Sequence, residues 1–248
     1  MTNSPPLPPD APPPCEHCLK PPVLCVCEGV EPINNRIGLL VLQHPQEQDR
    51  LLGTARLATL QLAKSDFRVG LSWPSLSKAL GREADPYHWA VLHLGSATGR
   101  DLPPDREVVA LDKKGEPLPD QDRALDGLRG IIVFDGTWSQ AKTLWWRNAW
   151  ILKVRRIALN PKQASLYGKL RREPRREGLS TIEAAGLAIS RLEGRPEIEA
   201  TLRGTFNRML IRYRAALANG DLREEAASAG ATAKKRDWRR RRPQGLAR

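Results

Sequence analysis

Two uninterrupted apolar runs constrain the fold of this chain more than any other feature of its sequence. They cover residues 37–43 (IGLLVLQ) and 130–135 (GIIVFD), and neither alternates apolar with polar residues. Such runs are typical of strands buried on both faces, as in parallel sheets with helices on both sides. We therefore expect an α/β fold with a mainly parallel sheet and flanking helices.

Shorter patterns continue the alternation of strands and helices. Further strands are predicted over residues 67–73, 90–95, 106–112 and 153–159. Helices are predicted over residues 51–64, 137–148, 180–193 and 197–218. No G-x-G-x-x-G follows a strand and no P-loop motif occurs, so neither a classical dinucleotide-binding fold nor a P-loop fold is supported. The chain also lacks an apolar run long enough to span a membrane and a secretory signal, which predicts a cytoplasmic protein without a membrane partner.

Positive charge is concentrated in two blocks of the chain. Lys and Arg number 40 against 28 Asp and Glu, for a formal net charge of +12. Residues 147–178 hold ten Lys or Arg against two Glu, and residues 233–248 hold eight against one Asp. Two such blocks on an otherwise slightly acidic body are typical of a surface that binds nucleic acid. A solvated face or an anionic membrane surface is the alternative, although neither block forms an amphipathic helix with a bulky apolar face.

All the cysteines of the chain lie near its start, with the spacing C-x2-C-x6-C-x-C. They are Cys15, Cys18, Cys25 and Cys27. A disulfide framework usually spreads its cysteines to join distant segments. Four thiolates on a short loop instead match the tetrahedral sulfur ligand set that suits Zn(II). We predict a structural zinc site with all four positions filled by protein, and an iron–sulfur centre is the alternative.

Asp135 is the candidate catalytic residue, because it ends a buried strand. In open α/β sheets, ligands gather at the carboxyl ends of strands. The alternative is that Asp135 only ties down the following turn. Two capping boxes, Thr137–Gln140 and Ser180–Glu183, begin the predicted helices nearby. Capping alone accounts for these residues, but a helix N-terminus also offers N–H groups to a carboxylate or phosphate.

Tryptophans gather on or beside the helix predicted over residues 137–148. They are Trp138, Trp145, Trp146 and Trp150. Trp138 and Trp145 differ by seven positions, and Trp146 and Trp150 differ by four, so we expect each pair to share a helix face. Such a stripe is usually core packing, and the alternative is a platform on which a base or adenine ring stacks.

Behind the cysteine cluster, four motifs in this order resemble the DTW-domain proteins, a family of tRNA-uridine aminocarboxypropyltransferases. They are HPQE at 44–47, DGTW at 135–138, SLYGKLRR at 165–172 and STIEAA at 180–185. The resemblance runs from Cys15 to about Ala218. It implies transfer of the 3-amino-3-carboxypropyl group from S-adenosylmethionine to N3 of a uridine in tRNA, with release of 5′-methylthioadenosine. It also implies a core similar to the knotted, SPOUT-type RNA modification enzymes.

The resemblance assigns roles to individual residues. Asp135 would act as the general base that removes the uridine N3 proton. The resemblance places the following residues at the S-adenosylmethionine pocket: Thr137, Trp138, Tyr167, Ser180, Thr181 and Glu183. It places four arginines of the first basic block near the RNA backbone: Arg171, Arg172, Arg175 and Arg176. A solvated loop is the alternative reading of these arginines.

The predicted organisation has four parts. A disordered Pro-rich tail (1–14) precedes a zinc-binding module (15–36), the catalytic α/β domain (37–218) and a basic flexible tail (219–248). The tail reads as a sequence-independent phosphate-binding segment. We expect tRNA as the partner, with the variable loop favoured over the D loop, and no obligate protein partner. The rival functions are a SPOUT-type RNA methyltransferase and a zinc-containing RNA-binding protein without catalytic turnover.

Overall fold

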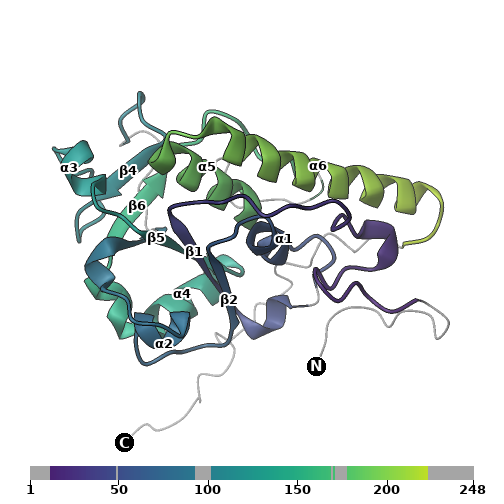
Figure 1. Ribbon diagram of the computed structural model, residues 1–248, viewed down its shortest axis with the longest axis horizontal. Helices are drawn as coiled ribbons and strands as arrows, with labels where there is room; N and C mark the ends of the chain where they lie inside the picture. Colours follow the sequence, from purple (N-terminus) through teal and green to yellow (C-terminus); the bar gives the residue numbers. More distant parts are fainter. Residues whose placement is uncertain (1–11, 49, 93–101, 169, 171–177, 223–248) are drawn as a thin grey trace, which may run out of the picture.

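A six-stranded sheet with helices on both faces forms the body of the protein (Figure 1). This computed structural model describes residues 12–48, 50–92, 102–168, 170 and 178–222. The strands are β1 (Gly38–Gln43), β2 (Ser65–Val69), β3 (Trp89–Leu92), β4 (Val108–Leu111), β5 (Gly130–Asp135) and β6 (Arg155–Leu159). The α-helices are α1 (Ala55–Leu60), α2 (Leu76–Leu80), α3 (Gln121–Leu125), α4 (Trp138–Arg147), α5 (Thr181–Glu193) and α6 (Pro196–Ala218). Short 3-10 helices are η1 (Pro22–Leu24), η2 (Pro45–Glu47), η3 (Pro86–His88) and η4 (Ala149–Lys153).

The sheet has the strand order β2-β1-β5-β3-β6-β4, and every pairing is parallel except that of β4 with β6. This confirms the prediction of an α/β fold with a mainly parallel sheet. The two apolar runs form the adjacent strands β1 and β5. Leu39 and Val41 of β1 pack into the core on one face, and Leu40 and Leu42 pack into the core on the other. Burial on both faces explains why the run shows no polar alternation.

Each face of the sheet has its own layer of helices. Residues of α1, α5 and α6 belong to the larger apolar cluster, and residues of α2, α4 and η4 belong to the second. Figure 1 shows α5 and α6 together on one side and α2 and α4 on the other. In the part of the chain that the structure describes, no helix has the length and apolar character needed to cross a bilayer.

Some predicted boundaries differ from the structure. The helix predicted over 51–64 is confined to α1, because the chain turns at residues 51–53, where the Gly53 N–H donates to the Arg50 carbonyl. The strand predicted over 67–73 is β2, which begins at Ser65 in register with Leu39 of β1. The helices α2 and α3 were missed, since five residues are too few to establish a helical period. Residues 93–95 of one predicted strand lie outside the described residues, as do 1–11 and 223–248 of the predicted tails.

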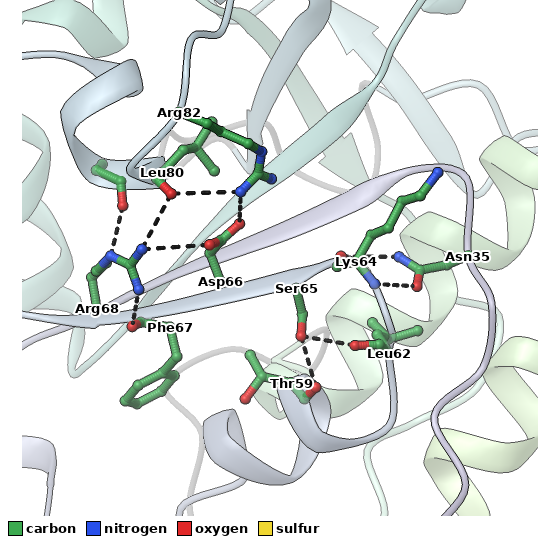
Figure 2. Close-up of polar contacts among 11 residues, drawn as sticks. Asn35, Thr59, Leu62, Lys64, Ser65, Asp66, Phe67, Arg68, Leu80 and Arg82 are labelled. Atoms are coloured by element: carbon green, nitrogen blue, oxygen red, sulfur yellow. Dashed lines mark hydrogen bonds and ion pairs between the residues drawn. The ribbon is translucent and has the colours of Figure 1, made fainter.

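The edge strand β2 is closed off by charged side chains (Figure 2). Arg68 donates from Nε to the Ala79 carbonyl at 2.8 Å and from Nη2 to the Leu80 carbonyl at 3.2 Å. These carbonyls lie in the last turn of α2, where helical partners are missing. Asp66 pairs with Arg82 at 2.8 Å. Charged side chains of this kind protect an edge strand from pairing with another chain.

The connections of the sheet diverge between β1 and β5, an arrangement that in open α/β sheets produces a crevice outside the carboxyl ends of the strands. From β1 the chain continues through α1 to β2, and from β5 it continues through α4 to β6 in the opposite direction along the sheet. Two adjacent parallel strands whose connections leave in opposite directions form a topological switch point. Ligands of open α/β sheets bind outside the carboxyl ends of the strands at such a point. These ends carry Gln43 and Asp135.

Candidate active site and metal centre

Asp135 is held from both sides of the crevice. Its Oδ1 accepts a 2.5 Å hydrogen bond from Thr181 Oγ1 on α5, and its Oδ2 accepts a 2.8 Å hydrogen bond from Gln43 Nε2 on β1. The side chain therefore does more than tie down its own turn, because the two donors, Thr181 and Gln43, belong to other elements. Asp135 is thus a fixed, half-buried carboxylate at the switch point.

Gln43 is a site residue that sequence reasoning missed. It pairs in register with Asp135 on the neighbouring parallel strand, so the two side chains lie on the same face. Gln43 is 4% exposed, and its Oε1 has no hydrogen-bond partner among the described residues. A buried acceptor without a donor calls for an explanation, and a ligand's N–H or O–H is one. The available signal was a polar residue closing an otherwise apolar strand, directly before HPQE.

Two helices begin at this crevice, and both predicted capping boxes are confirmed. Thr137 caps α4 and Ser180 caps α5, each with reciprocal bonds to the third helical residue. Thr181, the first residue of α5, touches Asp135. The partial positive charge of a helix N-terminus favours an anionic ligand group.

The HPQE segment lies against the start of α4 because Gly136 has no side chain. A Cβ at Gly136 would lie 3.0 Å from Gln140 Cβ and 3.5 Å from His44 Cβ. Gln140 Nε2 also donates to Gln46 Oε1 at 3.3 Å. Glu47 of the same segment is 7% exposed, with Oε1 unpartnered among the described residues. The β1–α1 connection therefore lies beside the start of α4, next to the carboxyl ends of β1 and β5.

Glu183 and Tyr167, two of the residues assigned to the cofactor pocket, are buried and bonded to protein. The Glu183 carboxylate accepts hydrogen bonds from Ser165 Oγ at 2.6 Å, from the Leu166 N–H at 2.8 Å, and from Ser180. Arg203 Nη1 lies 3.1 Å from the same carboxylate. These contacts join the segment before residue 169 to the start of α5.

Tyr167 has a similar structural position. Its hydroxyl donates to the Leu52 carbonyl at 2.6 Å, and its ring packs edge-on against Phe206 with 4.8 Å between centroids. Among the other predicted pocket residues, Thr137 is exposed and Trp138 is half-buried at the carboxyl edge. The predicted RNA-binding arginines, Arg171, Arg172, Arg175 and Arg176, lie outside the described residues.

A pocket of about 110 Å³ lies beside Glu183. Its charged lining residues are Glu107, Lys162, Glu183, Arg191, Glu199 and Arg203. Arg191 pairs with Glu107 at 2.8 Å and with Glu199 at 2.9 Å. Because ligand pockets usually enclose at least about 300 Å³, this pocket does not by itself accommodate a nucleoside cofactor.

The cysteine cluster has the geometry of a single-metal site. The Sγ atoms of Cys15, Cys18, Cys25 and Cys27 all lie within 4.8 Å of one another, and Cys18 Sγ lies 3.9 Å from Cys25 Sγ. In a tetrahedral site with Zn–S bonds of 2.3 Å, the sulfur atoms lie about 3.8 Å apart. His17, between two of the cysteines, is exposed. The four thiols can therefore hold one tetrahedral metal ion.

The thiols of the cluster differ in acidity. The backbone N–H of Cys18 lowers the pKa of the Cys15 thiol to about 6. Burial raises the pKa of Cys18 to about 11, and it also raises the pKa of Cys27. A metal ion binds thiolates, so it must displace protons from the buried thiols.

The cysteine loop contacts the β1–α1 connection. Lys20, which is 6% exposed, donates from Nζ to the Arg50 carbonyl at 2.6 Å. On the other side of the loop, Arg212 of α6 donates to the Cys25 carbonyl. Leu24 is fully buried in the core that α5 and α6 share. The cysteine loop thus supports the segment that follows HPQE.

Comparison with known proteins gives one family and several relatives. The DTW domain matches residues 12–214. Three relatives carry the name tRNA-uridine aminocarboxypropyltransferase 2. The protein from Macaca fascicularis is 28% identical over 192 residues, which are 77% of this chain and 60% of the relative. Those from Drosophila melanogaster and Mus musculus are each 30% identical, over 76% and 77% of this chain and 70% and 60% of the relative.

The chain thus spans 60% of the length of the macaque and mouse relatives. No solved structure matches it. The family match covers the cysteine cluster, both strands of the crevice and both capped helices. The chain belongs to the DTW domain family.

Proposed function

We propose that this protein transfers the 3-amino-3-carboxypropyl group of S-adenosylmethionine to N3 of a uridine in tRNA and releases 5′-methylthioadenosine. Family membership and the names of the relatives support this activity. The observation that carries it is Asp135, a carboxylate fixed by two donors at the switch point of the sheet. N3–H is a weak acid, and a positioned carboxylate is suited to remove its proton.

The proposed reaction balances with Asp135 as the base. Its carboxylate takes the N3 proton, N3 forms a bond to the γ-carbon, and the C–S bond breaks with its electron pair passing to sulfur. S-adenosylmethionine supplies the carbon activated by its sulfonium. Gln43 and Thr181 use one acceptor position on each oxygen of Asp135, and a carboxylate has about four. The remaining positions are available to the uridine.

Positioning decides which carbon is attacked, because the methyl and γ-carbons are bonded to the same sulfur. We assign to the pocket the surfaces of Thr137, Trp138 and Thr181 at the two helix N-termini. The partial positive charge there suits the carboxylate of the transferred group. Tyr167 and Glu183 contribute by holding the pocket walls in place.

We propose that the cysteine cluster holds one structural Zn(II). The sulfur ligand set and its spacing fit that ion, and no position is left open for chemistry. Through Lys20, the ion would stabilise the β1–α1 connection. An iron–sulfur centre would be distinguished by visible absorption and iron content.

We propose that the catalytic core is of the knotted SPOUT type, as the resemblance implies.

We also propose that the RNA backbone binds to the basic block that includes Arg171, Arg172, Arg175 and Arg176. The partner in this proposal is tRNA, bound through its backbone phosphates. The test of the arginines is the slope of log affinity for tRNA against log salt concentration. Replacing one arginine that contacts a phosphate should lower that slope.

The test of the function is mass spectrometry of the small product after incubation with S-adenosylmethionine and unmodified tRNA. Methylthioadenosine formed only with tRNA supports the proposal. S-adenosylhomocysteine would instead establish methyl transfer, and neither product would leave the RNA-binding alternative. Asp135→Asn keeps the shape of the side chain and should reduce transfer by roughly 10²- to 10⁴-fold. Full activity in that variant would rule out the general-base role.

A further inference from the structure

The outer face of α4 carries an exposed tryptophan. Trp146 is 79% exposed, more than any other exposed large hydrophobic residue that the structure describes. Its neighbours are used inside the protein: Trp145 packs edge-on against Phe134, and Trp150 is 7% exposed with Nε1 donating to the Trp73 carbonyl. Trp146 is therefore the member of the cluster that is available to a partner.

The expectation that Trp146 and Trp150 share a helix face is wrong. The α-helix ends at Arg147, and the chain continues through Asn148 into η4. Asn148 is fully buried and bonds to the Leu144 and Leu71 carbonyls, which redirects the chain toward the core. Trp150 consequently points inward, whereas Trp146 remains on the solvent side.

The exposed charged residues that flank Trp146 in the chain are positive. Lys142 lies one helical turn before it, Arg147 directly after it and Lys153 in η4, and all three are exposed. The sequence from residue 136 to residue 172 contains no Asp or Glu. No ion pair to these three cations occurs among the described residues. Exposed cations that flank an exposed aromatic ring in the chain fit a polyanion with unpaired bases rather than a second protein surface.

The position of α4 relates this face to the candidate active site. The helix begins three residues after Asp135, and Trp146 lies about 12 Å further along its axis at 1.5 Å per residue. The helix runs from the carboxyl edge of the sheet back across the face opposite α5 (Figure 1). A strand with one nucleotide at Asp135 can therefore cross the start of α4 and continue along its outer face.

We propose that Lys142, Trp146, Arg147 and Lys153 form a docking face for the tRNA segment that flanks the target uridine. Trp146 stacks on an unpaired base, and the three cations contact phosphates. Stacking of this kind accepts any base, so the face contributes affinity and register rather than choice of sequence. The inference rests on the proposed function for the identity of the RNA.

The test is equilibrium binding of unmodified tRNA to the full chain at several salt concentrations. Trp146→Ala should weaken binding roughly 5- to 150-fold, and Trp146→Phe should retain most of the affinity. Lys142→Ala and Arg147→Ala should each lower the slope of log affinity against log salt by about one. Matched controls are Tyr87→Ala, which removes an aromatic side chain of a 63% exposed residue, and Arg214→Ala, which removes an exposed cation on α6. Both control variants should bind tRNA with the affinity and salt dependence of the wild-type chain.

The readouts separate this proposal from the proposed function. Binding requires no turnover, so a Trp146 effect in a protein that forms no methylthioadenosine would support the docking face and reject the activity. Unchanged binding by Trp146→Ala, with the same melting temperature, would overturn the docking face whatever the activity. Loss of a dimer in Trp146→Ala, seen by light scattering, would assign the face to a second copy and also overturn it. A wild-type chain that binds no tRNA would overturn both.

Discussion

Gln43→Leu tests the geometry of the candidate site directly. The Gln43 amide donates a 2.8 Å hydrogen bond to Asp135 Oδ2, and leucine has a comparable volume but no donor. The change leaves Thr181 as the side-chain donor to Asp135 among the described residues. A hydrogen bond to a charged group contributes about 1.5–3 kcal/mol. If all of this free energy serves to orient Asp135 in the transition state, its loss lowers kcat roughly 10- to 150-fold.

The same substitution should change stability little. Gln43 Oε1 is buried without a partner, and an unsatisfied buried acceptor costs about 1–3 kcal/mol. Leucine removes that acceptor together with the donor, so the two effects oppose each other. Gln61→Leu is the matched control, because Gln61 is also buried and donates at 2.6 Å to Thr205. Gln61 lies at the end of α1 that leads into β2, away from Asp135.

The assay is steady-state release of methylthioadenosine from S-adenosylmethionine and unmodified tRNA, with thermal unfolding of each variant alongside. Gln43→Leu should lose kcat, keep its KM for tRNA and keep its melting temperature. Gln61→Leu should show the reverse, with a lower melting temperature and unchanged kcat. Wild-type kcat in Gln43→Leu would refute the positioning role. An equal loss of stability in both variants would show that Gln43 acts only as a core residue.

Two further predictions concern buried groups outside the proposed reaction. Glu183→Ala leaves Arg203 without its partner and removes the acceptor for the Leu166 N–H, so the free energy of unfolding should fall by about 3–5 kcal/mol in a denaturant titration. A residue that served only to contact the cofactor would leave that value unchanged. Burial raises the pKa of Cys18 to about 11 and also raises that of Cys27, so both thiols are protonated at pH 7 in the metal-free chain. Zn(II) should therefore release at least these two protons per ion in weakly buffered solution, and metal affinity should rise with pH. Binding without proton release would contradict coordination by these thiolates.

Local patterns in the sequence were enough to predict several parts of the structure. The apolar runs became β1 and β5, because burial on both faces permits no polar alternation. Both capping boxes formed, since their hydrogen bonds join residues only three apart. The cysteine spacing was likewise sufficient, because a short loop brings the four Sγ atoms together.

Other features depended on contacts between distant segments. Gln43 and Asp135 are 92 residues apart, and only the parallel register of β1 and β5 places their side chains side by side. Lys20 reaches the Arg50 carbonyl, and Tyr167 reaches the Leu52 carbonyl, through packing that no local pattern encodes.

The tryptophans show where sequence alone determined the structure and where it did not. Their spacing placed Trp138, Trp145 and Trp146 on a helix, which the structure confirms. The helical period alone predicted a common face for Trp146 and Trp150, but buried Asn148 ends the helix between them. Helical periodicity is a short-range property that can be read from residue spacing, whereas the point at which a helix stops depends on what the fold packs against it. Tertiary structure therefore decided that Trp150 is buried and Trp146 faces solvent.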